Sequence, residues 1–320
     1  MIVSEFRQTT QQTKTTMMNS ISTYLVSIIL LFNLVIYETI ESSYTPVVMY
    51  HGMGDTAYGS IESVKTFLEN KLTGIYVTSI QMGSNAEEDF FSSYLMNLNK
   101  QVEKACSMIK ADSNLKNGYN AIGFSQGGQI LRAIAQRCPE PPMKNLISLG
   151  GQHQGVYGLP KCLGTVKICN YVREMLNFGA YVSYIQDNLV QAEYWHDPLQ
   201  EQLYRDRSIF LADINNEKQP RNESYKTNLI KLKNLVLVQF LNDTIVQPKE
   251  SSWFQFYQPG QAKNVYKLKD SPLYKEDWIG LKQLDQTKRL KLLGTIGDHL
   301  QFHVHGKWFN DEIVEPYLST

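Results

Sequence analysis

The sequence predicts an α/β fold in which helices flank a mostly parallel central sheet, and three observations predict it. Short apolar strands alternate with helical segments along the 320-residue chain, an alternation that favours a parallel sheet. One strand leads into a helix through a Gly-x-Ser-x-Gly turn at residues 123–127. The run NLVLVQFLN at 234–242 is almost continuously apolar, which is typical of a strand buried on both faces.

Composition and charge exclude several classes of partner. Lys and Arg together number 31, as do Asp and Glu, so the formal net charge is zero. Basic residues form no cluster of the kind that binds nucleic acid. The cysteines have no Cys-x-x-Cys spacing, which argues against a zinc site. We therefore expect no metal, no organic cofactor and no nucleic acid.

Residues 1–42 differ from the remainder and are interpreted as a leader that contains a signal peptide. Its apolar core, YLVSIILLFNLVIY at 24–37, is shorter than the about 20 residues that a membrane-spanning helix needs, but it suits a signal peptide. We expect cleavage between Tyr37 and Tyr44, leaving a domain over 46–320 with no stable membrane anchor. An uncleaved anchor is the alternative.

Four cysteines follow the leader, an even number that indicates disulfides with three possible pairings. Cys162 and Cys169 are near neighbours in the sequence and can close a small loop, which leaves Cys106 with Cys138. Acceptor sites for N-glycosylation occur at two asparagines. Leader, cysteines and acceptor sites together indicate an oxidising, lumenal compartment.

The order of the expected elements follows the alternation. Strands are expected at 46–50, 74–81, 119–124, 145–150, 234–242 and 290–296, and helices at 61–71, 90–111, 129–137 and 308–318. Between about 156 and 230 the alternation is lost and helical runs near 171–178 and 181–194 take its place. We interpret this segment as a cap inserted into the sheet domain.

The turn at 123–127 carries the candidate nucleophile, Ser125. Strand, tight turn and helix in this order form the nucleophile elbow of α/β-hydrolases, in which the serine hydroxyl is lifted clear of the sheet. Gly123 and Gly127 fit the crowded backbone on either side, since they have no β-carbon. A plain glycine turn that begins a helix is the alternative.

Two residues beyond later strands complete the hydrolase pattern. Asp243 follows the strand at 234–242, and His299 follows the strand at 290–296. The order Ser, Asp, His is that of α/β-hydrolase triads, and the carboxyl ends of the strands are where catalytic groups gather. Asp298 is the weaker acid candidate, because adjacent residues on an extended turn generally point apart.

Two glycines in HGMGD, at 51–55, allow backbone N–H groups to form half of an oxyanion hole.

Other histidines compete with His299 for the role of base, or could bind a metal. His303 and His305 have metal-like spacing, but no Cys/His cluster accompanies them; the alternative is that they are solvated residues before the last helix. Of the remaining histidines, His51 belongs to the oxyanion loop and His153 and His196 to the cap, so their positions relative to the strands are wrong for the base.

From about Pro46 to the C-terminus the sequence closely resembles the lysosomal palmitoyl-protein thioesterases. The resemblance rests on HGMGD at 51–55, GYNAIGFSQGGQ at 118–129, PPMKNLISLGGQHQGVYGLP at 141–160, LVQAEYWHDP at 189–198, SIFLADIN at 208–215, FLNDTIV at 240–246 and GDHLQ at 297–301. It departs from the family where Thr56 and Ala57 replace a common cysteine pair, and where Asp206 replaces a glycosylated asparagine.

The resemblance implies site residues. It implies Ser125 as nucleophile, His299 as base, Asp243 as orienting acid, and the backbone N–H groups of Met53 and Gln126 as the oxyanion hole. It further implies the disulfides Cys106–Cys138 and Cys162–Cys169 and glycans on Asn222 and Asn242.

The expected reaction is hydrolysis of a palmitoyl thioester on a cysteine of an S-acylated protein or peptide, through an acyl-serine intermediate in the lysosomal lumen. Ile245, Val246 and Trp195 are candidates for the acyl groove. Two alternatives remain open, since a lipase or general esterase uses the same triad, and a catalytically silent hydrolase fold would act as a binding protein.

Overall fold

The computed structural model describes residues 24–25, 44–158 and 167–319. The chain divides into two units, Met1–Ser43 and Tyr44–Thr320, and the fold described below is that of the second. The expected signal peptide lies outside the described residues, as do Cys162 and the side chain of Cys169.

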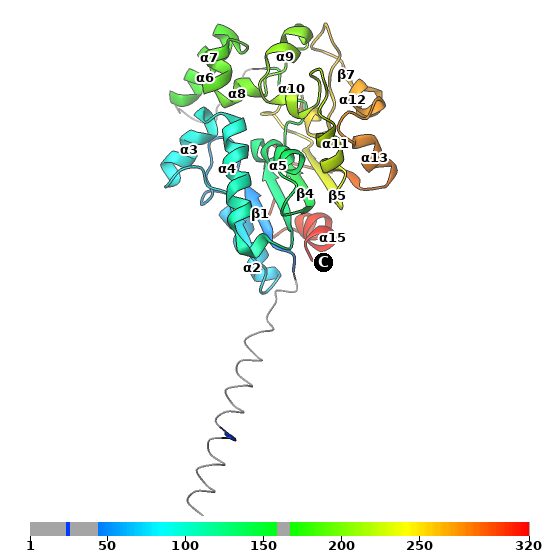
Figure 1. The fold of residues 1–320 in the computed structure, drawn as a ribbon. Coiled ribbons are helices and arrows are strands. Elements are labelled where there is room, and N and C mark those ends of the chain that lie inside the picture. Colours follow the sequence, from blue (N-terminus) through cyan, green and yellow to red (C-terminus); the bar gives the residue numbers. More distant parts are fainter. Residues whose placement is uncertain (1–23, 26–43, 159–166, 320) are drawn as a thin grey trace, which may run out of the picture. The chain divides into compact units, whose positions relative to one another are not determined.

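A six-stranded sheet forms the centre of the domain, and all of its neighbouring strands pair in parallel. Its strands, in spatial order, are β2 (Val77–Ser79), β1 (Val47–Tyr50), β3 (Tyr119–Phe124), β4 (Met143–Leu149), β5 (Asn234–Phe240) and β8 (Leu290–Thr295). Helices α2 (Glu62–Lys71), α4 (Leu98–Ala111) and α5 (Gln126–Arg137) cover it (Figure 1). The predicted fold class is confirmed.

Successive residues of the central strands alternate between two hydrophobic cores, one on each face of the sheet. In β1, Val48 and Tyr50 pack into a core with residues of α4 and α5, whereas Val47 and Met49 pack into a core with residues of α2 and the C-terminal segment. Every residue of β1 and β3 is buried. Both faces are therefore covered, which explains why these strands read as continuous apolar runs.

The prediction of one helix over 90–111 is wrong, because two helices occupy this stretch. They are α3 (Ala86–Leu95) and α4, which begins only at Leu98. The Asn97 side chain caps α4 by accepting from the N–H groups of Asn99 and Lys100. An asparagine that satisfies these first-turn donors starts a new helix, so the chain turns at this point. The strand expected at 74–81 is also shorter, reduced to β2.

The segment expected as a cap joins β4 to β5. Its described helices are α6 (Lys167–Gly179), α7 (Ser183–Asn188), α8 (Val190–Glu193), α9 (Glu201–Arg207), α10 (Leu211–Ile214) and α11 (Glu223–Leu229). Val172, Leu176 and Ile185 of α6 and α7 form a small core together with Tyr94 of α3. The segment therefore packs onto the domain through these helices and through loop hydrogen bonds such as that from Tyr157 N–H to the Gln247 carbonyl at 2.8 Å.

The C-terminal third adds short elements around β5 and β8. They are β6 (Phe256–Tyr257), β7 (Val265–Tyr266), α12 (Pro272–Lys275), α13 (Leu281–Gln286), α14 (Lys307–Phe309), a π-helical turn at Asn310–Val314 and α15 (Glu315–Tyr317). The last helix expected at 308–318 is thus interrupted by a π-helical turn. A disulfide between Cys106 and Cys138 joins α4 to the end of α5.

A buried carboxyl, that of Glu193, links α8 to the first turn of α4. It is fully buried, and both of its oxygens accept from the N–H of Leu98, at 2.9 and 3.1 Å. Burial raises the pKa of the Glu193 carboxyl well above its usual range. Its protonated form is therefore favoured in the folded state, and folding should become less favourable as pH rises through the raised pKa.

We predict that Glu193→Gln weakens this dependence on pH, because glutamine keeps an acceptor for Leu98 without a titrating group. Urea unfolding at pH 5 and pH 8 measures it. The wild type should lose more stability between these values than the variant, by about 1.4 kcal/mol for each unit by which the pKa is raised within that range. Parallel losses in the two proteins would contradict the prediction.

Candidate active site

Ser125 occupies the turn between β3 and α5 in a strained backbone conformation. Its φ is 52° and its ψ is −119°, a region that residues with side chains rarely adopt. The neighbouring backbones are packed so closely that a β-carbon on Gly123 would lie 2.5 Å from Gly128, and one on Gly127 would collide with the carbonyl oxygen of Tyr50. This packing holds the turn in place and directs the hydroxyl away from the sheet.

Ser125, His299 and Asp243 form a continuous chain of hydrogen bonds. The distance from Ser125 Oγ to His299 Nε2 is 2.8 Å, and that from His299 Nδ1 to Asp243 Oδ2 is 2.6 Å. The three residues follow β3, β8 and β5, whose parallel strands end at the same edge of the sheet. Residues that are 174 positions apart in the sequence are therefore brought into contact.

The Asp243 carboxylate is fixed by donors on its other oxygen. Its side chain is fully buried, and Oδ1 accepts from the N–H groups of Ile245 and Val246, both at 2.9 Å. An ionised carboxylate only accepts hydrogen bonds, so Nδ1 of His299 carries the proton. Nε2 is then free to accept from the serine hydroxyl.

Asp298 serves the same histidine in another way. Its Oδ1 accepts from the backbone N–H groups of His299 and Thr244, each at 2.7 Å, and its Oδ2 accepts from the Thr244 hydroxyl. The hydrogen bond from His299 N–H is the main cause that lowers the pKa of this carboxyl below its usual range. Asp298 thus joins the loop after β5 to the loop after β8 by hydrogen bonds. Its position next to His299 in the sequence did not predict this role.

The two expected oxyanion donors flank Ser125. Gln126 is the first residue of α5, where helical N–H groups have no partner within the helix. Met53 lies in the turn after β1, and its neighbour Gly52 approaches so closely that a β-carbon there would lie 3.1 Å from Ser125 Cβ. An anion held here would also lie at the positive end of the α5 dipole.

Helix α3 anchors the loop that carries Met53, a contact that the sequence did not predict. The buried Asp89 accepts from the N–H groups of Ala57 and Met82 and lies 3.1 Å from His51 Nε2. Ser93 accepts from the N–H of Gly54 at 2.8 Å. No local motif predicts these contacts. Ala57, His51 and Gly54 lie 32–39 positions away from their partners along the chain, and Met82 is separated from Asp89 by a loop.

A narrow cavity of about 40 Å³ leads to Ser125. Two of the three groove candidates, Ile245 and Val246, line it. The third, Trp195, lines an adjoining hollow instead, and Leu176 belongs to both walls. The remaining lining residues of the pocket are Met53, Gln152, Val156, Gly158, Gln191 and Tyr194. Its lining combines apolar side chains with the carboxamides of Gln152 and Gln191 and the phenol of Tyr194.

The other histidines have structural partners. His153 is buried against Arg132 and Ser148 at 3.2 and 2.9 Å, and burial, together with the Arg132 charge, lowers the pKa of its ring well below the usual range. His196 contacts the Glu201 carboxylate at 3.0 Å. Neither is in the hydrogen-bond chain that contains Ser125.

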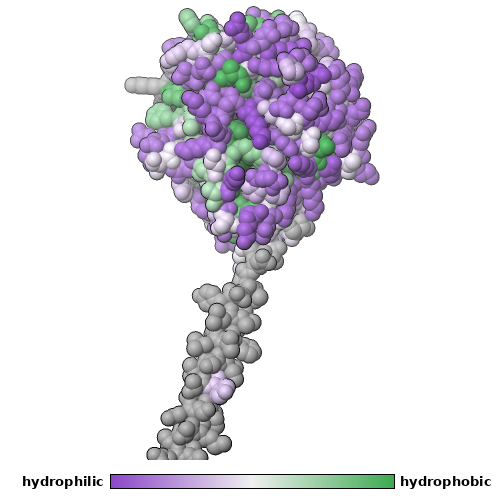
Figure 2. Space-filling model, viewed as in Figure 1, coloured by the Kyte–Doolittle hydropathy of each residue, from purple (hydrophilic) through white to green (hydrophobic). Residues whose placement is uncertain are grey.

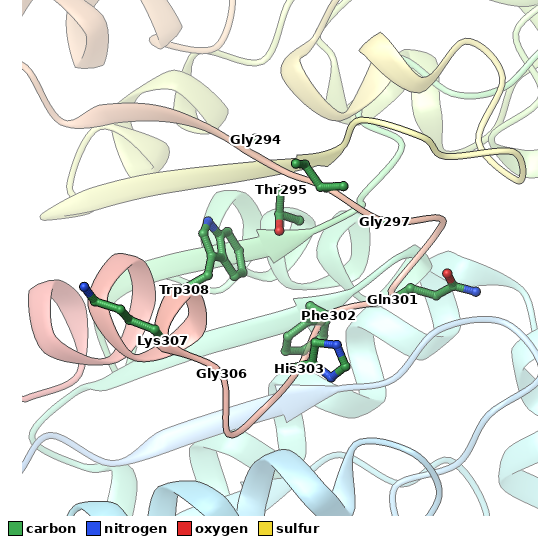
Figure 3. A pocket seen from close by; sticks show the side chains of 10 residues that line it. Gly294, Thr295, Gly297, Gln301, Phe302, His303, Gly306, Lys307 and Trp308 are labelled. Atoms are coloured by element: carbon green, nitrogen blue, oxygen red, sulfur yellow. The ribbon is translucent and has the colours of Figure 1, made fainter.

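A larger hollow beside β8 is a poor candidate for the site. Its volume is about 860 Å³, and its wall is formed by the segment that runs from Gly294 past His303 to Trp308 (Figure 3). None of the three hydrogen-bonded residues at Ser125 lines it. His305 packs edge-on against Phe67. Within the described residues, no group of three or more His, Cys, Asp or Glu side chains has a geometry that would hold a metal ion.

No helix in the described part of the chain is sufficiently long and apolar to cross a membrane. Asn222 and Asn242, the two glycosylation candidates, are exposed. Oδ1 of Asn222 caps α11 by accepting from the N–H of Ser224, whereas a glycan would be attached at Nδ2.

Comparison with known proteins places this chain in a family. The family model described as palmitoyl protein thioesterase matches residues 46–299. The chain is 54% identical over 258 residues to palmitoyl-protein thioesterase 1 of Caenorhabditis elegans, covering 80% of this chain and 86% of that protein. It is 41% identical over 296 residues to palmitoyl-protein thioesterase 3 of Dictyostelium discoideum, covering 92% and 96%. Lysosomal thioesterase PPT2 of Mus musculus is 28% identical over 282 residues, covering 87% and 89%. The chain belongs to the palmitoyl protein thioesterase family.

Proposed function

We propose that the protein hydrolyses palmitoyl thioesters of S-acylated proteins or peptides, with Ser125 as nucleophile, His299 as base and Asp243 as orienting acid. The observation that carries the proposal is the unbroken hydrogen-bond chain from Ser125 Oγ through His299 to Asp243, at 2.8 and 2.6 Å. It lies at the mouth of a partly apolar pocket. The family to which the chain belongs acts on the same class of substrate.

In the acylation step Ser125 Oγ attacks the thioester carbonyl, and its proton passes to His299 Nε2. The C–S bond then breaks, His299 gives this proton to the leaving sulfur, and the acyl group stays on Ser125. The thiolate has an unperturbed pKa of about 8.5, so the bond can break before the proton is fully transferred. In the second step the neutral His299 accepts a proton from water, whose oxygen attacks the acyl ester, and returns it to Ser125 Oγ as the fatty acid is released.

Stabilisation of the developing oxyanion falls to the backbone N–H groups of Met53 and Gln126. The loss of one such donor typically costs about 3 kcal/mol of barrier. A β-carbon on Gly52 would lie 3.1 Å from Ser125 Cβ, and this close approach of the loop to the turn supports two donors that are in place before the substrate arrives. No reorganisation is then needed as charge develops.

The acyl chain is proposed to enter the pocket along Ile245 and Val246 and to continue past Leu176 to Trp195. The first two side chains line the pocket at Ser125, and Trp195 lines the hollow that adjoins it. Leu176 lies between the two spaces, and the acyl chain is proposed to pass beside this side chain from one to the other.

We further propose that the protein acts in the lysosomal lumen and reaches it by the secretory pathway. The name of the mouse relative places that protein in the lysosome. The disulfide between Cys106 and Cys138 is consistent with an oxidising compartment, and a second between Cys162 and Cys169 would fit it. Leader removal from residues 1–42, the cap at about 156–230, and glycans on Asn222 and Asn242 are part of this proposal.

Replacement of the nucleophile tests the proposal directly. We predict that Ser125→Ala lowers the kcat for an S-palmitoyl peptide by about 10⁴-fold or more, since the acyl-serine can no longer form. The measurement is steady-state hydrolysis, with the oxyester analogue run in parallel and a fluorophosphonate probe reporting labelling of Ser125. Near-normal turnover by the variant would rule out the assignment. Oxyester preference in the wild type would indicate a lipase, and absence of turnover and labelling a silent fold.

The two aspartates beside His299 should behave differently. Asp243→Asn should lower kcat by about 10⁴-fold, because an amide in that place no longer holds the Nδ1–H tautomer. Asp298→Asn is the matched control, since its amide oxygen still accepts the backbone N–H of His299, and kcat should fall less than about tenfold. Steady-state kinetics at equal folded concentration compare them; equal losses would contradict the distinction.

Ser93 is predicted to be a positioning residue for the oxyanion loop. Ser93→Ala removes the acceptor for Gly54 N–H, so the adjacent Met53 N–H should be held less firmly. We expect kcat to fall about tenfold, less than the 10²–10³ for a donor removed outright, with little change in KM. Ser107→Ala, which removes an exposed hydroxyl in α4, is the control. A loss confined to KM, or equal behaviour of the two variants, would overturn this role.

A further inference from the structure

Large apolar side chains are exposed on α6, α7 and the turn between them. Tyr171 is 41% exposed, Phe178 78%, Val182 43% and Tyr184 65%. We refer to these four as the cap patch. Figure 2 shows hydrophobic residues on the surface at the end of the molecule where Figure 1 places α6 and α7. Exposed apolar side chains gathered in one place commonly mark a binding surface.

Packing of the helices does not account for the cap patch. Val172 and Leu176 of α6 are buried in the small core with Tyr94, so the inner face of α6 is already apolar. Tyr171 and Phe178 are seven residues apart and lie on the outer face. The folded domain therefore gains nothing from their apolar character, which fits a surface that a partner covers.

The cap patch is continuous with the proposed acyl path. Val182 belongs to the cap patch and also lines the hollow with Trp195, and Leu176 joins that hollow to the pocket at Ser125. Leu176, Val182 and Trp195 thus extend apolar surface from the cap patch toward the pocket at Ser125, beside Asp197, Gln200 and Arg207, which line the same hollow. This continuity connects the surface with the acyl part of the substrate rather than with its protein part.

We propose that the cap patch docks on the surface of a zwitterionic lipid bilayer, so that a palmitoyl chain passes from the bilayer into the pocket without crossing water. This proposal rests on the proposed function, because the acyl chain of an S-palmitoylated protein lies in a bilayer before it is cleaved. Tyr and Phe side chains are typical of the membrane–water interface, where one end of the ring is apolar and the other polar.

The charges on the same helices select the kind of lipid. Residues 167–188 contain two basic residues, Lys167 and Arg173, and two acidic residues, Glu174 and Asp187, so their formal charge is zero. Attachment to anionic lipid uses an excess of Lys and Arg, which this segment lacks. The remaining mode of attachment is insertion of the apolar side chains among neutral headgroups. Binding of this kind should not weaken when the salt concentration is raised.

Flotation with phosphatidylcholine vesicles tests the docking. Protein from the medium of secreting cells is compared with the double variant Phe178→Ser/Tyr184→Ser and with Ile296→Ser, which removes an 81% exposed apolar side chain from the end of β8. The double variant should bind about tenfold less, since two apolar side chains no longer enter the lipid, whereas Ile296→Ser and 0.5 M NaCl should change little. Unchanged binding by the double variant, or binding lost in salt, would overturn the proposal.

Kinetics separate this proposal from the proposed function. With a short-chain, water-soluble acyl thioester, the double variant should match the wild type; with a palmitoyl peptide held in the vesicles, its kcat/KM should fall about tenfold. Equal activity on both substrates would refute the docking and leave the thioesterase intact. No wild-type activity on either would refute the proposed function itself. Sedimentation that shows a dimer in the wild type and a monomer in the double variant would assign the cap patch to a second copy of the chain instead.

Discussion

The hydrogen bond between Asp243 and His299 is the interaction on which the candidate site depends. It fixes which ring nitrogen carries the proton, and the other nitrogen is then available to the serine hydroxyl. The carboxylate is held in position to accept the hydrogen bond from this nitrogen, because its second oxygen accepts from the N–H groups of Ile245 and Val246. Those two residues also wall the pocket. The same short segment thus orients the histidine and shapes the acyl site.

The parallel sheet makes this contact possible. Every strand of the sheet runs in the same direction, so the loops after β3, β5 and β8 meet at one edge. The strain at Ser125, of about 1–3 kcal/mol for such a conformation, is tolerated because close backbone packing at Gly123 and Gly127 surrounds the turn. Asp298 then holds the loops after β5 and β8 together through backbone donors. Rigidity at this edge comes from hydrogen bonds to the main chain more than from side-chain pairs.

The parts of the fold that were predictable from sequence have local signals. The strand β3 and the turn at Ser125 are marked by apolar residues and glycines at fixed positions, and β5 by its long apolar run. The division between α3 and α4 was missed because a single asparagine, Asn97, both ends one periodic pattern and caps the next. Asp89 and Ser93 were missed for a different reason. Their function depends on partners across the fold, and a polar residue inside a helix gives no sign of such contacts.

The segment between β4 and β5 shows how one element can meet two demands. The inner face of α6 must be apolar to pack on α3 and to wall the pocket, and Val172 and Leu176 meet that demand. Its outer face would ordinarily be polar, yet Tyr171 and Phe178 are exposed there. Exposed aromatic side chains promote unwanted association between protein molecules in water. Their presence on α6 is explained if, as proposed above, they contact the bilayer that holds the acyl chain of the substrate. A helix with an apolar inner face and exposed aromatic side chains on its outer face lets an acyl chain exchange one apolar environment for another at the point where the thioester must reach Ser125.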